Sequence, residues 1–119
     1  MKILIVDDNE VNRILPRALL ERAGVSVAEA SDGAIALERL AAEPFDAVLL
    51  DISMPGLSGL DVCRRIRADP QRRTLRVIAY TAHAFQSAAD EIMAAGFDGL
   101  LIKPIQREAL LQAFAIPAA

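Results

Sequence analysis

The chain has 119 residues, 54% of them hydrophobic, and a formal net charge of −3. That length suits one domain with a single buried core. No apolar run approaches the ~18–20 residues of a membrane span, and the run at residues 3–6 is too short for the core of a signal peptide. Cys63 is the only cysteine, which excludes an intramolecular disulfide, so we expect a cytoplasmic protein.

The charge pattern gives no electrostatic footprint for nucleic acid, because acidic residues outnumber basic ones and no long basic run occurs. Two short arginine groups, at residues 64–67 and 72–73, are expected to be solvated positions on a helix and in a loop. We therefore expect no direct nucleic-acid partner and no membrane span.

Apolar runs typical of strands alternate along the chain with segments of helical period. The first run is 2–6, followed by a helix predicted at 10–23 with Gly24 as its C-cap. The apolar positions that mark this helix are Val11, Ile14, Leu15, Ala18 and Leu19. A second strand is predicted at 26–30, and a second helix from Asp32-Gly33 to about residue 42.

The third unit begins with the apolar run 47–50, which ends on Asp51. A loop over 54–59, with Pro and Gly, leads into a helix with Leu60, Cys63 and Ile66 inward, where Cys63 is an inert small hydrophobe. The remaining segments repeat the alternation, with strands predicted at 76–80 and 99–102 and helices at 84–95 and 106–114.

Strands that are apolar throughout belong in a parallel sheet with helices on both faces. Five strand–helix units of this length predict an α/β fold with a doubly wound, five-stranded parallel sheet. Right-handed crossovers leave few topologies, of which the flavodoxin-like order 2-1-3-4-5 fits best.

Polar residues stand at the carboxyl ends of four predicted strands. They are Asp7 and Asp8 after the first, Asp51 at the third, Thr81 at the fourth and Lys103 at the fifth. In the order 2-1-3-4-5, ligands bind between the first and third strands, where the three aspartates would meet. Singly, each residue could have a plain structural role: Asp7, Asp8 or Thr81 could cap the following helix, and Lys103 could be a surface lysine. Their joint occurrence at one edge favours a site.

Three neighbouring carboxylates repel one another, and a hard divalent cation removes the conflict. Mg²⁺ favours oxygen ligands, few carboxylates and a substrate phosphate, so the pattern predicts Mg²⁺ and phosphate together. Asp51 is then the natural nucleophile, since aspartate can form an aspartyl phosphate. Lys103 offers a compact positive charge to phosphate oxygens, and the Thr81 hydroxyl can donate to another.

The chain resembles the receiver domains of two-component response regulators in four motifs. The motifs are Ile5-Val6-Asp7-Asp8-Asn9, Asp51-Ile52-Ser53-Met54-Pro55-Gly56 with Gly59, Tyr80-Thr81-Ala82-His83-Ala84, and Lys103-Pro104. They occur in order, each after a predicted strand, over nearly the whole chain. The sequence at residues 81–84 and 103–105 is most similar to that of receivers from hybrid sensor kinases and single-domain phosphorelay regulators.

This resemblance implies that Asp51 accepts a phosphoryl group from a phosphohistidine of a sensor histidine kinase or a histidine phosphotransfer protein. It implies that Asp8 and Asp51 bind Mg²⁺ directly, that Asp7 acts through water and that Ser53 offers its backbone carbonyl. Such a domain is no enzyme in the ordinary sense, because it catalyses only its own phosphorylation and dephosphorylation.

The resemblance also implies that Thr81 and Lys103 hold the phosphoryl oxygens, and that Thr81 moves toward them on phosphorylation. Pro104 follows Lys103 in a bond that receivers often hold cis. His83 is expected to line the mouth of the pocket.

Three features depart from the common receiver pattern. Leu100 stands three residues before the lysine, where many receivers carry Tyr or Phe as a rotamer switch. Pro16 falls inside the first predicted helix, where it removes the hydrogen bond to Asn12 and should kink the helix. The last helix ends early, at residues 115–117, and we expect residues 1–119 to form one receiver domain without an output domain.

A chain of this kind must signal by binding a protein. The surface expected to change lies nearest Thr81 and Lys103 and comprises the segments 84–95, 99–102 and 106–114. With Leu100 in place of an aromatic ring, we expect backbone shifts of residues 81–84 to carry the signal.

Three other functions fit the predicted fold less well. A flavodoxin would need a phosphate loop after the first strand, where residues 7–10 are acidic or amide and repel phosphate without a metal. An aspartyl phosphatase would usually carry a second acid at position 53, which is Ser53, and a cap domain. A pseudo-receiver would not need the complete acidic set.

Overall fold

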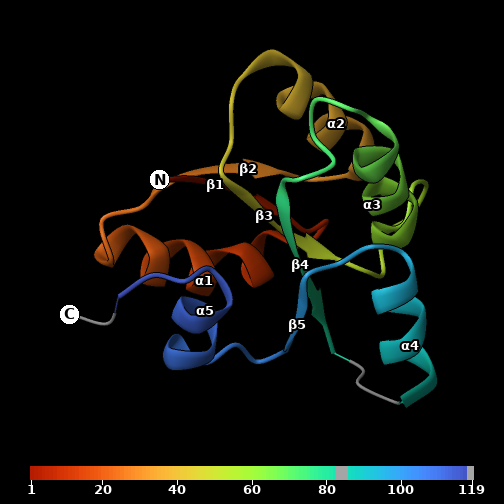
Figure 1. Cartoon of the computed structure of the whole chain (residues 1–119). Coiled ribbons are helices and arrows are strands. Elements are labelled where there is room, and N and C mark those ends of the chain that lie inside the picture. Colours follow the sequence, from red (N-terminus) through yellow and green to blue (C-terminus); the bar gives the residue numbers. More distant parts are fainter. Residues whose placement is uncertain (83–85, 118–119) are drawn as a thin grey trace.

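The computed structural model describes residues 1–82 and 86–117, without the side chains of 86–88. Strands and helices alternate in this part of the chain (Figure 1): β1 Lys2–Val6, α1 Glu10–Arg22, β2 Ser26–Ala30, α2 Gly33–Ala42, β3 Ala47–Asp51, α3 Gly59–Ala68, β4 Arg76–Thr81, α4 Gln86–Ala94, β5 Gly99–Ile102 and α5 Arg107–Ala113. The strands form one parallel sheet in the order β2-β1-β3-β4-β5, which confirms the predicted fold.

The central strands are buried on both faces, as their continuous apolar sequences predict. Every residue of β3 is buried, including Asp51 at its end, which lies opposite Tyr80 of β4 in the strand register. The edge strand β2 differs, because its Glu29 is only half-buried and pairs in register with Ile5. The sheet therefore has an apolar centre, and Glu29 is a charged position on its edge strand.

Two hydrophobic layers hold the helices to the sheet. On one face α1 and α5 contribute Leu20, Leu110 and Phe114, which are almost fully buried against β1, β3 and β4. On the other face α2, α3 and α4 pack through a larger apolar set that includes Leu40, Ile66 and Ile92. Cys63 is buried in this second layer, as predicted, and burial raises the pKa of its thiol to about 11.

The helix ends follow ordinary capping chemistry. Asn9 caps α1 by accepting a hydrogen bond from the Val11 N–H, and Asp32 caps α2 in the same way through Ile35. At α3, Ser58 and Asp61 form a reciprocal capping box. The start predicted for α4 at residue 84 lies outside the described residues.

The apolar positions of α1 do not all face the core, contrary to the amphipathic pattern that they form. Val11, Ile14 and Leu15 are 70%, 60% and 46% exposed, whereas Pro16 and Leu20 are buried. The helix continues through Pro16 as one element from Glu10 to Arg22. Its sheet-facing side therefore contains the proline, and an apolar surface is left in solvent.

Two arginines expected in solvent are structural. Arg67 donates to the carbonyls of Gly96 and Leu75 and pairs with the Asp98 carboxylate at 2.8 Å, with its side chain 20% exposed. Arg72 donates to the Leu40 carbonyl and pairs with Asp69. Both side chains tie helix ends to loops at the amino edge of the sheet, so the prediction of solvated positions was wrong for them.

The start of β1 and the end of α5 lie at the amino edge of the sheet, on the left of Figure 1. The chain enters β1 at Lys2, and Arg76, the first residue of β4, donates to the carbonyl of Ala113 at the end of α5. In the part of the chain that the structure describes, no helix has the length and apolar character needed to cross a membrane.

Candidate functional site

The carboxyl edge of the sheet collects the five polar residues predicted there. Asp51 and Thr81 are the last residues of β3 and β4, Asp7 and Asp8 follow β1 directly, and Lys103 follows β5. Asp7, Asp51 and Thr81 are almost fully buried, while Asp8 is exposed. The open side of the site is therefore the side of Asp8.

The three aspartates form one cluster. Asp7, Asp8 and Asp51 each offer a carboxylate oxygen, and these oxygens lie within 4.8 Å of one another. The order of the strands produces this cluster, because β1 and β3 are neighbours and Val6 lies opposite Leu50. The predicted meeting of the three carboxylates between the first and third strands is confirmed.

Lys103 crosses from β5 to the acidic cluster. Its Nζ donates to Oδ2 of Asp7 at 2.9 Å and lies 3.4 Å from Oδ1 of Asp51. The ammonium also sits 4.7 Å from the centre of the Tyr80 ring. Only 17% of the lysine side chain is exposed, so the alternative of a surface lysine was wrong.

The electrostatics of the cluster are unbalanced. Burial, followed by repulsion from Asp7, raises the pKa of Asp51 from 3.8 to about 6. Burial opposes the charge of Lys103, but the hydrogen bond to Asp7 and the charge of Asp51 outweigh it and raise the pKa of the lysine. One ammonium faces three carboxyl groups, which leaves an excess of negative charge. A dication with oxygen ligands fits this donor set.

Local hydrogen bonds orient the carboxyl groups. The N–H of Asn9 donates to Oδ1 of Asp7 at 2.9 Å, and the N–H of Ser53 donates to Oδ1 of Asp51 at 3.3 Å. Asn9, and not Asp7 or Asp8, is the N-cap residue of α1, so the alternative of a capping role for the two acids was wrong. Ser53 itself is exposed beside the cluster.

The remaining predicted residues lie around this centre. Thr81 is buried at the end of β4, and its carbonyl accepts a hydrogen bond from the Lys103 N–H at 2.8 Å. The Lys103–Pro104 bond is cis. Leu100 lies in β5, partly buried against the layer of α2, α3 and α4. His83 lies outside the described residues.

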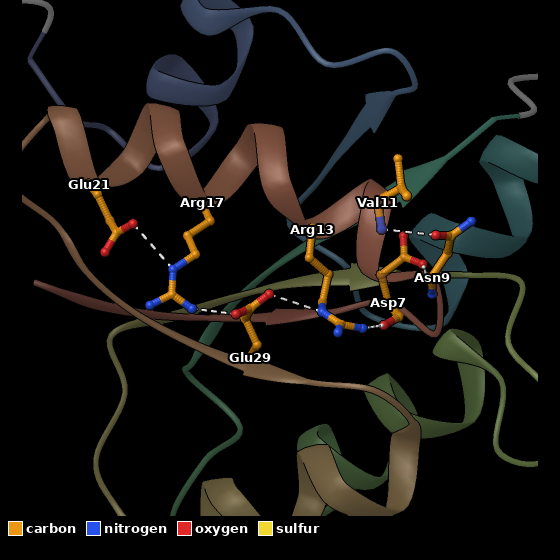
Figure 2. A network of polar contacts seen from close by, with 7 residues as sticks. All are labelled: Asp7, Asn9, Val11, Arg13, Arg17, Glu21 and Glu29. Carbon is orange, nitrogen blue, oxygen red and sulfur yellow. Dashed lines mark hydrogen bonds and ion pairs between the residues drawn. The ribbon is translucent and has the colours of Figure 1, made fainter.

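One group beside the site was not predicted from the sequence. Arg13 of α1 donates from Nη1 to the main-chain carbonyl of Asp7 at 2.6 Å and from Nε to Glu29 at 3.0 Å (Figure 2). Neither Arg13 nor Glu29 lies in the four motifs named above. The only signal was Glu29 itself, a charged residue inside an otherwise small and apolar strand.

Comparison with known proteins decides the family. Residues 3–115 match the model of the response regulator receiver domain. The chain belongs to the response regulator receiver family. As a receiver, it is a phosphoacceptor domain of two-component signal transduction, and the flavodoxin and phosphatase alternatives are excluded.

Related receivers occur both alone and within long kinases. The chain is 39% identical over 111 residues to the chemotaxis protein CheY of Pseudomonas aeruginosa, covering 92% of this chain and 90% of that protein. It is 39% identical over 110 residues to the signal transduction histidine-protein kinase BarA of Escherichia coli, covering 92% of this chain. The chain spans 12% of the length of that kinase.

Solved receivers share the same fold. Chemotaxis protein CheY4 of Vibrio cholerae superposes with a TM-score of 0.90 at 30% identity, covering 96% of this chain and 95% of that one. The receiver domain of a sensor histidine kinase of Pseudomonas aeruginosa superposes with a TM-score of 0.84 at 33% identity, covering 96% of this chain and 97% of that one. That structure holds a magnesium ion in its active-site cleft.

Proposed function

We propose that Asp51 is the phosphoryl-accepting residue and that a phosphohistidine of a sensor histidine kinase or a histidine phosphotransfer protein is the donor. The observation that carries this proposal is the position of Asp51, buried at the end of β3 beside two further aspartates and 3.4 Å from the Lys103 ammonium. With a pKa of about 6, the carboxyl group is mostly ionised at neutral pH. It is therefore available as a nucleophile.

In the proposed step, a carboxylate oxygen of Asp51 attacks the phosphorus of the donor. The bond from phosphorus to the imidazole nitrogen breaks, and its electron pair remains on that nitrogen. Lys103, held by Asp7 and the Tyr80 ring, places its ammonium beside the acceptor oxygens, where phosphoryl charge arrives. We assign the Thr81 hydroxyl to another phosphoryl oxygen and expect Thr81 to move toward it.

We assign the metal site to Asp8 and Asp51 as direct ligands, the Ser53 carbonyl as a third, and Asp7 as a ligand through water. The cluster of carboxylate oxygens within 4.8 Å and its excess negative charge support a divalent cation. Mg²⁺ bound there would supply positive charge to the phosphoryl oxygens. The magnesium ion in the related kinase receiver supports this choice of metal.

Residues 1–119 then act as one receiver domain in the cytoplasm, whose chemistry is limited to its own phosphorylation and dephosphorylation. The downstream partner is a protein that contacts the face formed by α4, β5 and α5. Ile102 of that face is 50% exposed and borders a shallow groove that extends to Gln106 and Ala109. An exposed apolar side chain beside Lys103 suits a surface that changes when Lys103 gains a phosphoryl ligand.

The acceptor assignment is tested by intact mass after treatment with acetyl phosphate and Mg²⁺. We expect one added phosphoryl group in the native protein and none in Asp51→Asn. Asp46→Asn is the matched control, because Asp46 precedes the same strand at its opposite end, and it should label like the native protein. Equal labelling of native protein and Asp51→Asn would refute the assignment.

A further inference from the structure

We propose that Arg13 is a positioning residue that holds Asp8 in place for the metal, through the main-chain carbonyl of Asp7. The inference rests on the proposed metal site. Arg13 lies in the first turns of α1, and only 14% of its side chain is exposed. The four motifs named above do not include it.

The geometry couples the guanidinium to the peptide bond between Asp7 and Asp8. Nη1 of Arg13 donates to the carbonyl oxygen of Asp7 at 2.6 Å, a short charge-assisted hydrogen bond. Because a peptide unit is planar, a donor held at its oxygen also fixes the direction in which the chain continues to Asp8. Figure 2 shows the guanidinium between Asp7 and Glu29.

Asp8 needs such support more than its neighbours do. Asp7 is fully buried, bound to Lys103 and to the Asn9 N–H, and Asp51 is buried at a strand end. Asp8 is exposed at the open side, yet its carboxylate reaches the other two. The direction of its backbone therefore decides whether an exposed side chain points into the cluster.

Glu29 holds the guanidinium of Arg13 from the side opposite to Asp7. Its Oε1 accepts from Nε of Arg13 at 3.0 Å, and its other carboxylate oxygen pairs with Arg17, which also contacts Glu21 (Figure 2). Glu29 is anchored in β2, opposite Ile5 of β1. It thus fixes the guanidinium and neutralises its charge, so Arg13 acts as a directed donor and not as a competing cation.

A purely electrostatic role and a positioning role of Arg13 predict opposite changes in Mg²⁺ affinity. If Arg13 acted only through its positive charge, its removal would make the site more negative and tighten Mg²⁺ binding. If Arg13 positions Asp8, its removal loosens a ligand and weakens binding. Losses of about tenfold are typical when a group that orients a metal ligand is removed.

The experiment measures the Mg²⁺ affinity of the full chain by calorimetry or amide shifts, without any phosphodonor. We expect Arg13→Ala to weaken binding by about tenfold. Arg17→Ala is the matched control, because it removes the same charge from the same helix. Arg17 contacts Glu29 but not Asp7, so the Mg²⁺ affinity of this variant should stay within about twofold of native. Native-like affinity in Arg13→Ala, or an equal loss in Arg17→Ala, would overturn the inference.

Two further variants separate the possible causes. In an Asp8→Asn background, Arg13→Ala should have little additional effect, because the ligand that it positions is already lost. If the single substitution Asp8→Asn leaves Mg²⁺ affinity unchanged, the proposed metal site itself is wrong. If Asp8→Asn weakens Mg²⁺ binding but Arg13→Ala does not, the metal site stands and the proposed role of Arg13 is wrong. Arg13→Lys keeps the charge but replaces the planar fork, in which Nη1 and Nε each hold one acceptor, by a single nitrogen. It should also weaken Mg²⁺ binding, which keeps the test valid if Arg13→Ala does not fold.

Discussion

Asp51 is buried next to a second carboxylate, and this raises its pKa from 3.8 to about 6. Because the folded pKa exceeds the unfolded one, folding favours the protonated acid and disfavours the ionised one. The penalty is absent below about pH 4, grows as pH rises toward 6, and is fully present above it. The gap between the two pKa values corresponds to about 3 kcal/mol.

We therefore expect Asp51→Asn to be more stable than the native protein at neutral pH, by up to about 3 kcal/mol, and equally stable near pH 4. Urea unfolding of both proteins with a chelator, between about pH 4 and pH 8, measures this difference. Adding Mg²⁺ at neutral pH should stabilise the native protein more than the variant, because the metal offsets the repulsion. A difference in stability that does not change with pH would contradict the electrostatic origin.

Single residues also show where sequence interpretation succeeded. Each aspartate follows an apolar run, and in a parallel sheet such positions meet at one edge, so the cluster could be predicted from strand order alone. Arg13, by contrast, could not be predicted as part of the site. Its role depends on how the first turns of α1 lie relative to β1 and β2, which no local pattern encodes.

At the scale of elements, the start of α3 is packed directly on the site. A Cβ placed on Gly59 would lie 2.2 Å from the carbonyl oxygen of Asp51 and 2.8 Å from Cα of Ile52. Both are backbone atoms that cannot rotate away, so the end of β3 would have to shift. Gly59 is required here because α3 approaches the strand that carries Asp51.

We expect Gly59→Ala to lower the free energy of unfolding by about 1–3 kcal/mol and to slow labelling of Asp51 by acetyl phosphate. Gly56→Ala is the control, since Gly56 has φ +76 but nothing within 4 Å of an added Cβ, and should cost about 1 kcal/mol without slowing labelling. Denaturant unfolding and intact mass measure the two effects. Native-like labelling in a folded Gly59→Ala protein would show that the loop tolerates the shift.

The exposed apolar side of α1 is a second feature at this scale. Val11, Ile14 and Leu15 stand on the helix that begins just after Asp8, the open side of the site. A protein donor that brings a histidine to Asp51 must contact the start of α1 beside Asp8. Contiguous exposed apolar side chains are typical of such protein contacts. The surface thus suits the phosphohistidine donor, while the face of α4, β5 and α5 suits the downstream partner.

We expect Ile14→Ser to leave stability within about 0.5 kcal/mol, because the side chain is 60% exposed. It should slow phosphoryl transfer from a protein donor but not from acetyl phosphate, which needs no docking surface. Met93→Ser of α4, a residue 54% exposed, is the matched control and should affect neither rate. Equal slowing with both donors would place the defect in the site and not in docking.

The helices also show the limit of periodicity. Spacing of apolar residues predicts α1, but it does not show which side of the helix faces the sheet: Pro16 and Leu20 are buried there, while Ile14 is exposed. In the same way, the short charged runs suggest solvated arginines, although Arg67 donates to the Gly96 carbonyl and Arg72 to the Leu40 carbonyl of α2, both far away in sequence. A short charged run carries no information about partners far away in sequence, so these contacts could not be predicted.

At the scale of the whole molecule, phosphorylation must shift an equilibrium between two arrangements of the fold. Thr81 and Lys103 are joined through the Thr81 carbonyl and the Lys103 N–H, so a movement of one strand end is passed to the other. Leu100 offers no aromatic ring for a rotamer switch. We therefore expect the signal to be carried by backbone displacement of β4, β5 and the segment after Thr81.

We expect beryllofluoride with Mg²⁺ to alter amide exchange or amide shifts mainly in α4, β5 and α5 and around residues 81–84. The Asp51→Asn variant, treated in the same way, should show no such change. Amide hydrogen exchange with and without beryllofluoride makes the measurement. Changes confined to α1 and α2 would show that the signal leaves the molecule through another face.

The positions of β1's first residue and of the end of α5 have a consequence for how this domain can be used. Lys2 and the end of α5 lie at the amino edge of the sheet, and the acidic cluster lies at the opposite edge. A polypeptide linker attached at either of these positions, or at both, leaves the opposite edge accessible to ligands and protein partners. The same polypeptide fold can therefore be transplanted as a module into longer proteins without rebuilding its chemistry, in keeping with its likeness to both a free-standing chemotaxis protein and one segment of a large kinase.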